Sequence, residues 1–215
     1  REDLIVTLSR AGYAKTQPLD VYRSQRRGGT GKKATSFKEE DFISKLFVAN
    51  THDTLLCFSS YGKVYWIKVY RLPRAGRNAK GRPIVNLLPL EKEERIQAVL
   101  PISAFEENKF VFMATEQGTV KKTPLSAYSR PMKNGIKAIK LKEKDKVVNV
   151  EITDGTKEIM LFSDAGKAIR FSEKDARPLG RVSQGVIGMR LDKKQKVISL
   201  IVVKPWLTIF PIALA

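Results

Sequence analysis

LIVTLSRAGYAKT, residues 4–16, is the stretch that decides the fold, because its pattern returns three more times. The other copies are LLCFSSYGKVYWIKV at 55–69, FVFMATEQGTVKKT at 110–123 and IMLFSDAGKAIRF at 159–171. Each joins two apolar runs through a Ser/Thr-x-x-Gly turn. Branched and aromatic side chains favour pleated, half-buried strands, and glycine allows the positive φ of a tight reversal. Each copy therefore predicts a β-hairpin.

A second element recurs in step with the hairpins. Four loop glycines follow the turn glycines by roughly 17 to 19 residues, and two further strand-like segments follow each loop. The loop glycines are Gly31, Gly81, Gly135 and Gly185. Segments such as PIVNLL and RIQAVLPI, or VIGMRL and KVISLIVV, give each repeat four short strands. Four strands per repeat of about 50 residues are typical of a propeller blade, so the fold class is all-β.

The repeats predict one array that covers nearly the whole chain. We expect a single domain built from repeats 3–50, 51–104, 105–153 and 154–204. Helical periodicity is scarce, and only residues 41–46 and 172–176 suggest a turn of helix. Residues 205–215 are apolar and lack the repeat pattern, which we interpret as a truncated or altered end. An uncovered last blade would favour dimerisation or aggregation.

The charge of the chain indicates a polyanionic partner. Lys and Arg number 40 and Asp and Glu 22, which gives a net charge of +18. Nucleic acid is the commonest partner for such a charge, and an anionic membrane is the second. The one Cys and one His exclude a zinc finger and a disulfide framework. We expect Cys57 to be a buried strand residue, and we predict no metal site and no catalytic residue.

Positive charge gathers in the loops around the loop glycines, and acidic residues follow in the next turn. Because both keep the phase of the repeat, we predict a continuous basic rim and a separate, more acidic edge. Such a rim would track the phosphates of bent duplex DNA with weak sequence readout. The residues predicted to line it are Lys32, Lys33, Arg74, Arg77, Lys80, Arg82, Lys121, Lys122, Arg130, Lys133, Lys137, Arg177 and Arg181.

The first basic loop is the most distinctive motif. It consists of Gln25, Arg26, Arg27, Gly28, Gly29, Thr30 and Gly31. Its glycines allow backbone N–H groups to approach a phosphate closely. Each of its arginines can donate two parallel hydrogen bonds to phosphate oxygens. Taken alone, the loop fits a phosphate contact and a flexible basic linker equally well.

Together with the rest of the chain, this loop resembles the gyrase A box of the C-terminal domain of DNA gyrase A. The resemblance also covers EEDFI, VANTHD, GRPIVNLLPLE, the third hairpin and VISLIV. It differs at Thr30, where the family usually has Lys or Arg, and Lys32 and Lys33 are placed to compensate. A nearly intact box favours gyrase over topoisomerase IV, whose related domain has a degraded box or none.

The resemblance implies a β-pinwheel, a spiral of blades that exchange strands and wrap DNA with a positive hand. It further implies a non-catalytic domain of an A2B2 holoenzyme, in which the remainder of gyrase A and gyrase B are the partners. The holoenzyme uses ATP and Mg²⁺ to introduce negative supercoils, and this domain needs no cofactor. The expected location is the cytoplasm, beside the nucleoid and without a membrane.

Two other classes of function stay open at this point. A protein-interaction propeller would carry Gly-His and Trp-Asp motifs, which the repeats lack. A nuclease or phosphoesterase would need clustered carboxylates or histidines.

Overall fold

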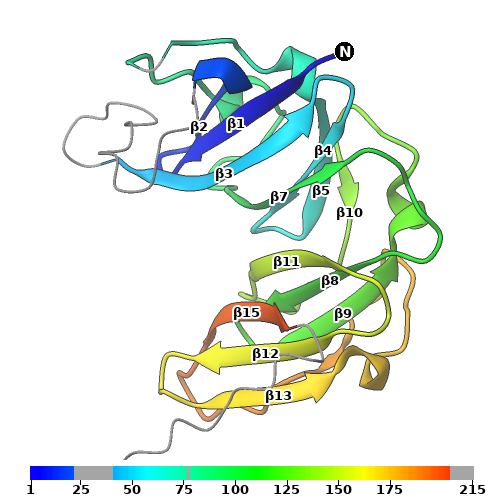
Figure 1. Cartoon of the computed structure of the whole chain (residues 1–215). Helices are drawn as coiled ribbons and strands as arrows, with labels where there is room; N and C mark the ends of the chain where they lie inside the picture. Colours follow the sequence, from blue (N-terminus) through cyan, green and yellow to red (C-terminus); the bar gives the residue numbers. More distant parts are fainter. Residues whose placement is uncertain (22–40, 77, 204–215) are drawn as a thin grey trace, which may run out of the picture.

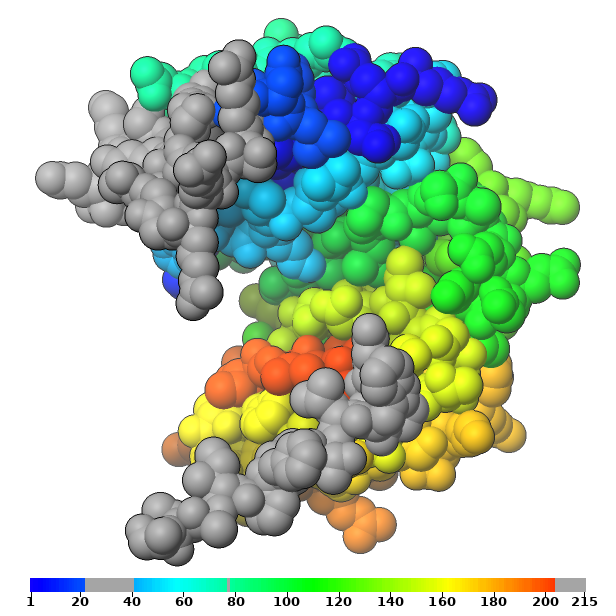
Figure 2. Space-filling model, in the orientation of Figure 1, coloured from blue at the N-terminus to red at the C-terminus, as the bar shows by residue number. Residues whose placement is uncertain are grey.

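The computed structural model describes residues 1–21, 41–76 and 78–203. Within them the chain forms short antiparallel sheets and no α-helix, which confirms the predicted all-β class. The sheets follow one another along an arc in the order of the sequence (Figure 1). The space-filling view is hollowed between the first and last sheets (Figure 2).

The first sheet shows how the blades are built. Its hairpin is β1 (Asp3–Ser9) and β2 (Tyr13–Pro18), and β3 (Ile43–Asn50) pairs with β1 on one side. The outer neighbour of β2 is β6 (Arg82–Pro83), which belongs to the second repeat. The sheet order is therefore β3-β1-β2-β6, and its fourth strand is supplied by the next repeat.

The next two sheets repeat this exchange. The second has the order β10-β5-β4-β7, and the third β11-β8-β9-β14. The outer strands β10 and β14 come from the third and fourth repeats. The strands are β4 (Thr54–Ser59), β5 (Lys63–Lys68), β7 (Ile96–Ile102), β8 (Phe110–Thr115), β9 (Thr119–Pro124), β10 (Ile136–Lys137), β11 (Val147–Thr153) and β14 (Val186–Ile187).

The fourth sheet lacks an outer strand in the described part of the chain. It contains β12 (Glu158–Ser163), β13 (Ala168–Ser172) and β15 (Val197–Val203) in the order β13-β12-β15. Among the described residues no exchanged segment pairs with β13, and its first three residues are exposed.

A short 3-10 turn follows each hairpin, and a further one follows β6. The turns are η1 (Leu19–Val21), η2 (Val69–Arg71), η3 (Ile84–Asn86), η4 (Leu125–Tyr128) and η5 (Glu173–Asp175). The helical turn expected at 172–176 is present as η5. The one expected at 41–46 is wrong, because β3 already begins at Ile43 and pairs with β1.

The core lies between successive sheets. Leu55 packs in the cluster shared with the first sheet, and the next residue, Leu56, packs in the cluster shared with the third. The two middle sheets are thus covered on both faces, which explains why β4 and β8 are continuous apolar runs. Cys57 is fully buried in the first cluster, as predicted.

Two loop glycines mark the places where the chain crosses to the preceding blade. Gly81 has φ +86°, and a Cβ atom there would lie 2.2 Å from the carbonyl oxygen of Ala14. Gly185 has φ +98°, and its Cβ would lie 2.5 Å from the carbonyl oxygen of Val120. Both positions require glycine for backbone conformation and for close approach to the hairpin.

Candidate nucleic-acid interface

The basic loops lie beside the outer strand of the preceding hairpin. The amide of Thr16 donates to Pro73 O at 2.9 Å, and Arg82 pairs with Ala14 further along β2. In the third blade the amide of Leu179 donates to Lys122 O at 2.8 Å before β14 pairs with β9. In both blades the basic loop is therefore held to the outer strand of the preceding hairpin at each of its ends.

Most of the predicted rim residues within the described ranges are exposed on or next to these loops. Arg181 is partly buried. The exposed side chains are those of Arg74, Lys80, Arg82, Arg130, Lys133, Lys137 and Arg177. They come from three consecutive basic loops, each of which leads into the outer strand of the preceding blade.

Two of these cations already have partners within the chain. Arg74 forms an ion pair with Glu2. Lys80 places its ammonium group 5.7 Å from the centre of the Tyr13 ring, a cation–π distance. Both contacts are exposed, so they contribute little stability and leave the charges accessible to a polyanion.

Lys121 and Lys122 are a correction, because the structure places them inside the blade. Lys121 is 0% and Lys122 4% exposed. The ammonium group of Lys121 donates to Ala138 O at 2.7 Å and also to Arg181 O, and that of Lys122 donates to Glu173 O at 2.7 Å. Both faces of β9 are covered by neighbouring sheets, so neither ammonium group can meet a phosphate on the surface.

Several predicted residues lie outside the described ranges. They are Gln25, Arg26, Arg27, Gly28, Gly29, Thr30, Gly31, Lys32, Lys33 and Arg77. Their assignment stays a prediction from the sequence.

Sequence reasoning missed Lys15. This lysine is 2% exposed, and its ammonium group donates to Gly76 O at 3.2 Å and to Ala79 O at 3.0 Å, both in the second basic loop. A signal was present, since Lys15 and Lys121 each stand three residues after a turn glycine. In both hairpins this position is buried, and its ammonium group bonds to backbone carbonyl oxygens of the basic loop that runs beside the hairpin.

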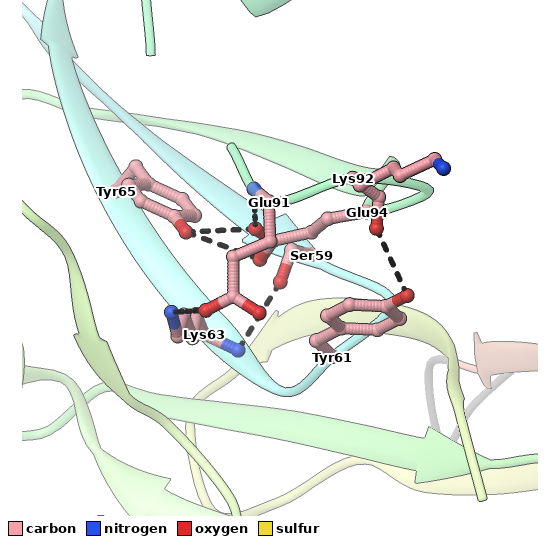
Figure 3. A network of polar contacts seen from close by, with 7 residues as sticks. All are labelled: Ser59, Tyr61, Lys63, Tyr65, Glu91, Lys92 and Glu94. Atoms are coloured by element: carbon pink, nitrogen blue, oxygen red, sulfur yellow. Dashed lines mark hydrogen bonds and ion pairs between the residues drawn. The ribbon is translucent and has the colours of Figure 1, made fainter. Parts of the chain in front are cut away.

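Each acidic turn is joined to the hairpin turn of its own repeat by a backbone hydrogen bond, as from the amide of Ser60 to Arg95 O at 2.8 Å. Figure 3 shows this arrangement in the second repeat. In the second repeat Glu91 forms an ion pair with Lys63, and the carboxylate of Glu94 is buried. Glu94 accepts bonds from the hydroxyl of Tyr65 at 3.0 and 3.1 Å and from the amide of Glu91 at 2.8 Å. These carboxylates are occupied in holding turns and do not converge on a common point.

The described residues contain no cluster of three or more His, Cys, Asp or Glu side chains that could hold a metal ion. Within the same ranges, no helix is long and apolar enough to cross a membrane.

Comparison with known proteins places this architecture in a family. The family model described as "DNA gyrase C-terminal domain, beta-propeller" matches residues 3–50, 53–103, 109–154 and 157–204. The chain belongs to this family. The matched segments follow one another with short gaps and account for most of the chain.

Sequence relatives point to gyrase A. The chain is 60% identical over 191 residues to the DNA gyrase A protein of Haemophilus influenzae, and these cover 89% of the chain and 22% of that protein. It is 57% identical over 202 residues to gyrase A of Escherichia coli K12, with 94% and 23% covered. The chain therefore spans less than a quarter of the length of these relatives, and it is a gyrase A C-terminal domain by sequence.

Solved structures agree on the fold. The C-terminal domain of DNA topoisomerase IV superposes with a TM-score of 0.81 at 31% identity, covering 94% of this chain and 62% of that one. A DNA gyrase A C-terminal domain gives 0.71 at 27% identity, with 94% and 66% covered. Because both of these domains share the blade architecture, the fold does not distinguish gyrase A from topoisomerase IV. The sequence identities of 50–60% to gyrase A proteins make that distinction.

Proposed function

We propose that this gyrase A C-terminal domain binds duplex DNA along the outer edges of its blades and bends it around the array. The observation that carries the proposal is the set of exposed cations on consecutive basic loops, which recur in the phase of the blades. The acidic side chains are held at the hairpin turns instead. A polyanion would therefore meet a surface along the loops on which positive charge predominates, although Glu2 pairs with Arg74 there.

The arc of the array supports bending over straight binding. Phosphates of a straight duplex can reach only part of a curved row of cations. Bending 20–30 base pairs by 40–90° costs on the order of 1–6 kcal/mol, and additional phosphate contacts can offset that cost. Sequence readout would be weak, because no helix in the described ranges is available for the major groove.

In the whole enzyme this domain would wrap DNA so that strand passage introduces negative supercoils. The box at Gln25 to Gly31 would contribute the first contact of the wrap. The other parts of gyrase A, together with gyrase B, would supply DNA cleavage and the ATP and Mg²⁺ chemistry, and the domain would act without a cofactor. The setting would be the bacterial cytoplasm, beside the nucleoid.

The test compares binding to duplexes of about 20 and about 100 base pairs over a range of salt. Nicked circles sealed with bound protein then report any change in linking number. A wrapping domain binds the longer duplex more tightly and leaves a linking-number change. Equal affinity per base pair and unchanged topology would refute wrapping.

Matched variants locate the surface. Lys133→Ala and Lys137→Ala remove exposed cations from a basic loop, while Lys92→Ala removes an exposed cation from an acidic turn. The logarithm of the binding constant falls as the logarithm of salt concentration rises, and each lost phosphate contact makes this slope about 0.9 less steep. The loop variants should show this decrease, and the turn variant should keep the parent slope. The opposite order would place DNA elsewhere.

A further inference from the structure

Lys121 lies at a junction of three repeats. Its own strand, β9, belongs to the third blade. One of its acceptors, Ala138 O, lies on the segment whose amide donates to Gly62 O in the second blade at 2.8 Å. The other acceptor, Arg181 O, lies in the basic loop of the fourth repeat.

The bonds of this lysine are strong and have few substitutes. A buried carbonyl left without a donor is destabilising, and a charged donor bonds more strongly than a neutral one. Burial lowers the pKa of Lys121 to about 8, and the positive charge of Arg181 adds to this lowering. The ammonium form is thus kept at a cost in a buried site, whereas the equivalent residue of the last blade, Ile169, is apolar and exposed.

Backbone bonds join the same two segments nearby. The amide of Lys140 donates to Ser183 O at 3.0 Å, two residues from Arg181. Within the loop, the amide of Ser183 donates to Gly180 O at 3.2 Å. The loop that carries Arg181 is consequently fixed against the third repeat around the Lys121 ammonium group.

We propose that Lys121 is a positioning residue of the DNA interface, which acts from the interior by fixing the basic loop that carries Arg181. The inference rests on the proposed DNA-binding function. Lys15 makes the corresponding bonds to Gly76 and Ala79 in the second basic loop. Two of the three described basic loops are thus held by a buried ammonium group of the preceding hairpin.

The experiment is a double-mutant cycle between Lys121→Met and Arg181→Ala in the full chain, read as affinity for a duplex of about 100 base pairs. Lys121→Met should weaken binding about five- to tenfold alone and less than about twofold when Arg181 is already alanine. Lys121→Arg, which keeps the cation, should retain most of the affinity. Additive losses would show that Lys121 does not act through Arg181.

Lys122→Met is the matched control, because it removes a buried ammonium group from the neighbouring position, where the acceptor is Glu173 O. Its effect should be additive with Arg181→Ala. If Lys121→Met does not fold, Lys121→Gln replaces it, since the amide retains a donor without charge. If Lys122→Met couples to Arg181→Ala as strongly as Lys121→Met does, a general loss of packing would explain the coupling, and the positioning role of Lys121 would be refuted.

Amide hydrogen exchange without DNA separates the two proposals. Lys121→Met should speed exchange at Leu179 and Ser183, while amides of β12 keep the parent rate. Unchanged exchange at both loop amides would overturn the positioning role even if the chain binds DNA. A parent chain that fails to bind duplex would refute the proposed function and leave the exchange result standing.

Discussion

The hydroxyl of Tyr65 lies 3.0 Å from Oε2 of Glu94 and occupies the place in the second blade that Lys15 and Lys121 fill in the first and third. Each of these residues stands three positions after its turn glycine. The tyrosine bonds to the acidic turn of its own repeat instead of to the following basic loop (Figure 3). One position in the repeat therefore serves two different polar networks.

Tyr65→Phe should destabilise the fold without affecting the basic loops. The change removes a donor from the buried Glu94 carboxylate, which should cost about 1–3 kcal/mol of unfolding free energy. Urea denaturation measures this loss. Tyr61→Phe is the control, because the exposed Tyr61 hydroxyl donates only to Lys92 O at 3.1 Å. Equal stability of the two variants would contradict the role of Glu94 in holding the turn.

The same tyrosine should resist ionisation. Burial and the neighbouring carboxylate raise the pKa of Tyr65 above its ordinary value of 10.0. Since the unfolded chain ionises first, this group lowers stability as the pH rises above about 10. Ultraviolet titration of the parent and Tyr65→Phe should show the same number of tyrosines ionising near the ordinary value. An additional tyrosine in the parent at that pH would refute the prediction.

Lys121 should titrate far below an ordinary lysine. With a folded pKa of about 8 and an ordinary value of 10.5, the unfolded chain binds the extra proton in this window. Its contribution to stability therefore rises with pH from about 8 to about 10.5 and is flat below. Lysine-specific NMR measures the midpoint, and Lys121→Met identifies the resonance. A midpoint at the ordinary value would show that the buried carbonyls fully compensate for the lost hydration.

Gly185→Ala should disrupt the exchange between the third and fourth repeats. A Cβ atom would lie 2.5 Å from Val120 O at a φ of +98°, so strain and overlap together should cost at least about 1–3 kcal/mol. Gly180→Ala in the same loop is the control, because nothing lies within 4 Å of its Cβ position. Thermal unfolding compares the two. Similar melting temperatures would mean that the exchanged strand is not fixed by Gly185.

The open edge of β13 should accept an added strand. In the other three blades the carbonyl oxygen of the turn glycine accepts an amide of the exchanged segment, as Gly118 O does from Gly188 at 2.8 Å. In the described part of the chain no such segment lies beside Gly166. A peptide with the sequence of residues 183–191 should bind there and shift the amide resonances of residues 166–170. The peptide with Gly185→Val should not bind, because the crossing requires a positive φ. Shifts confined to other blades would refute this edge as the acceptor.

The sequence by itself determined the hairpins, their turns and the period of the array. These features depend on neighbours along the chain: alternating strand formers, a glycine at each reversal, and charges in fixed phase with both. The buried position of Cys57 followed from the same local pattern. The resemblance to gyrase A also rested on contiguous motifs, which the family comparison confirmed.

Only the tertiary structure decided which repeat supplies the outer strand of each blade. The two-residue pairings of β6, β10 and β14 are too short to predict a partner from sequence. Packing likewise decided whether Lys121 and Lys122 are exposed or buried. A basic pair after a turn resembles a solvated edge, but sheets cover both faces of β9, so each ammonium group must find carbonyl oxygens inside. The equivalent residues of the last blade, Ile169 and Arg170, are exposed, and in the described part of the chain no exchanged strand lies beside β13.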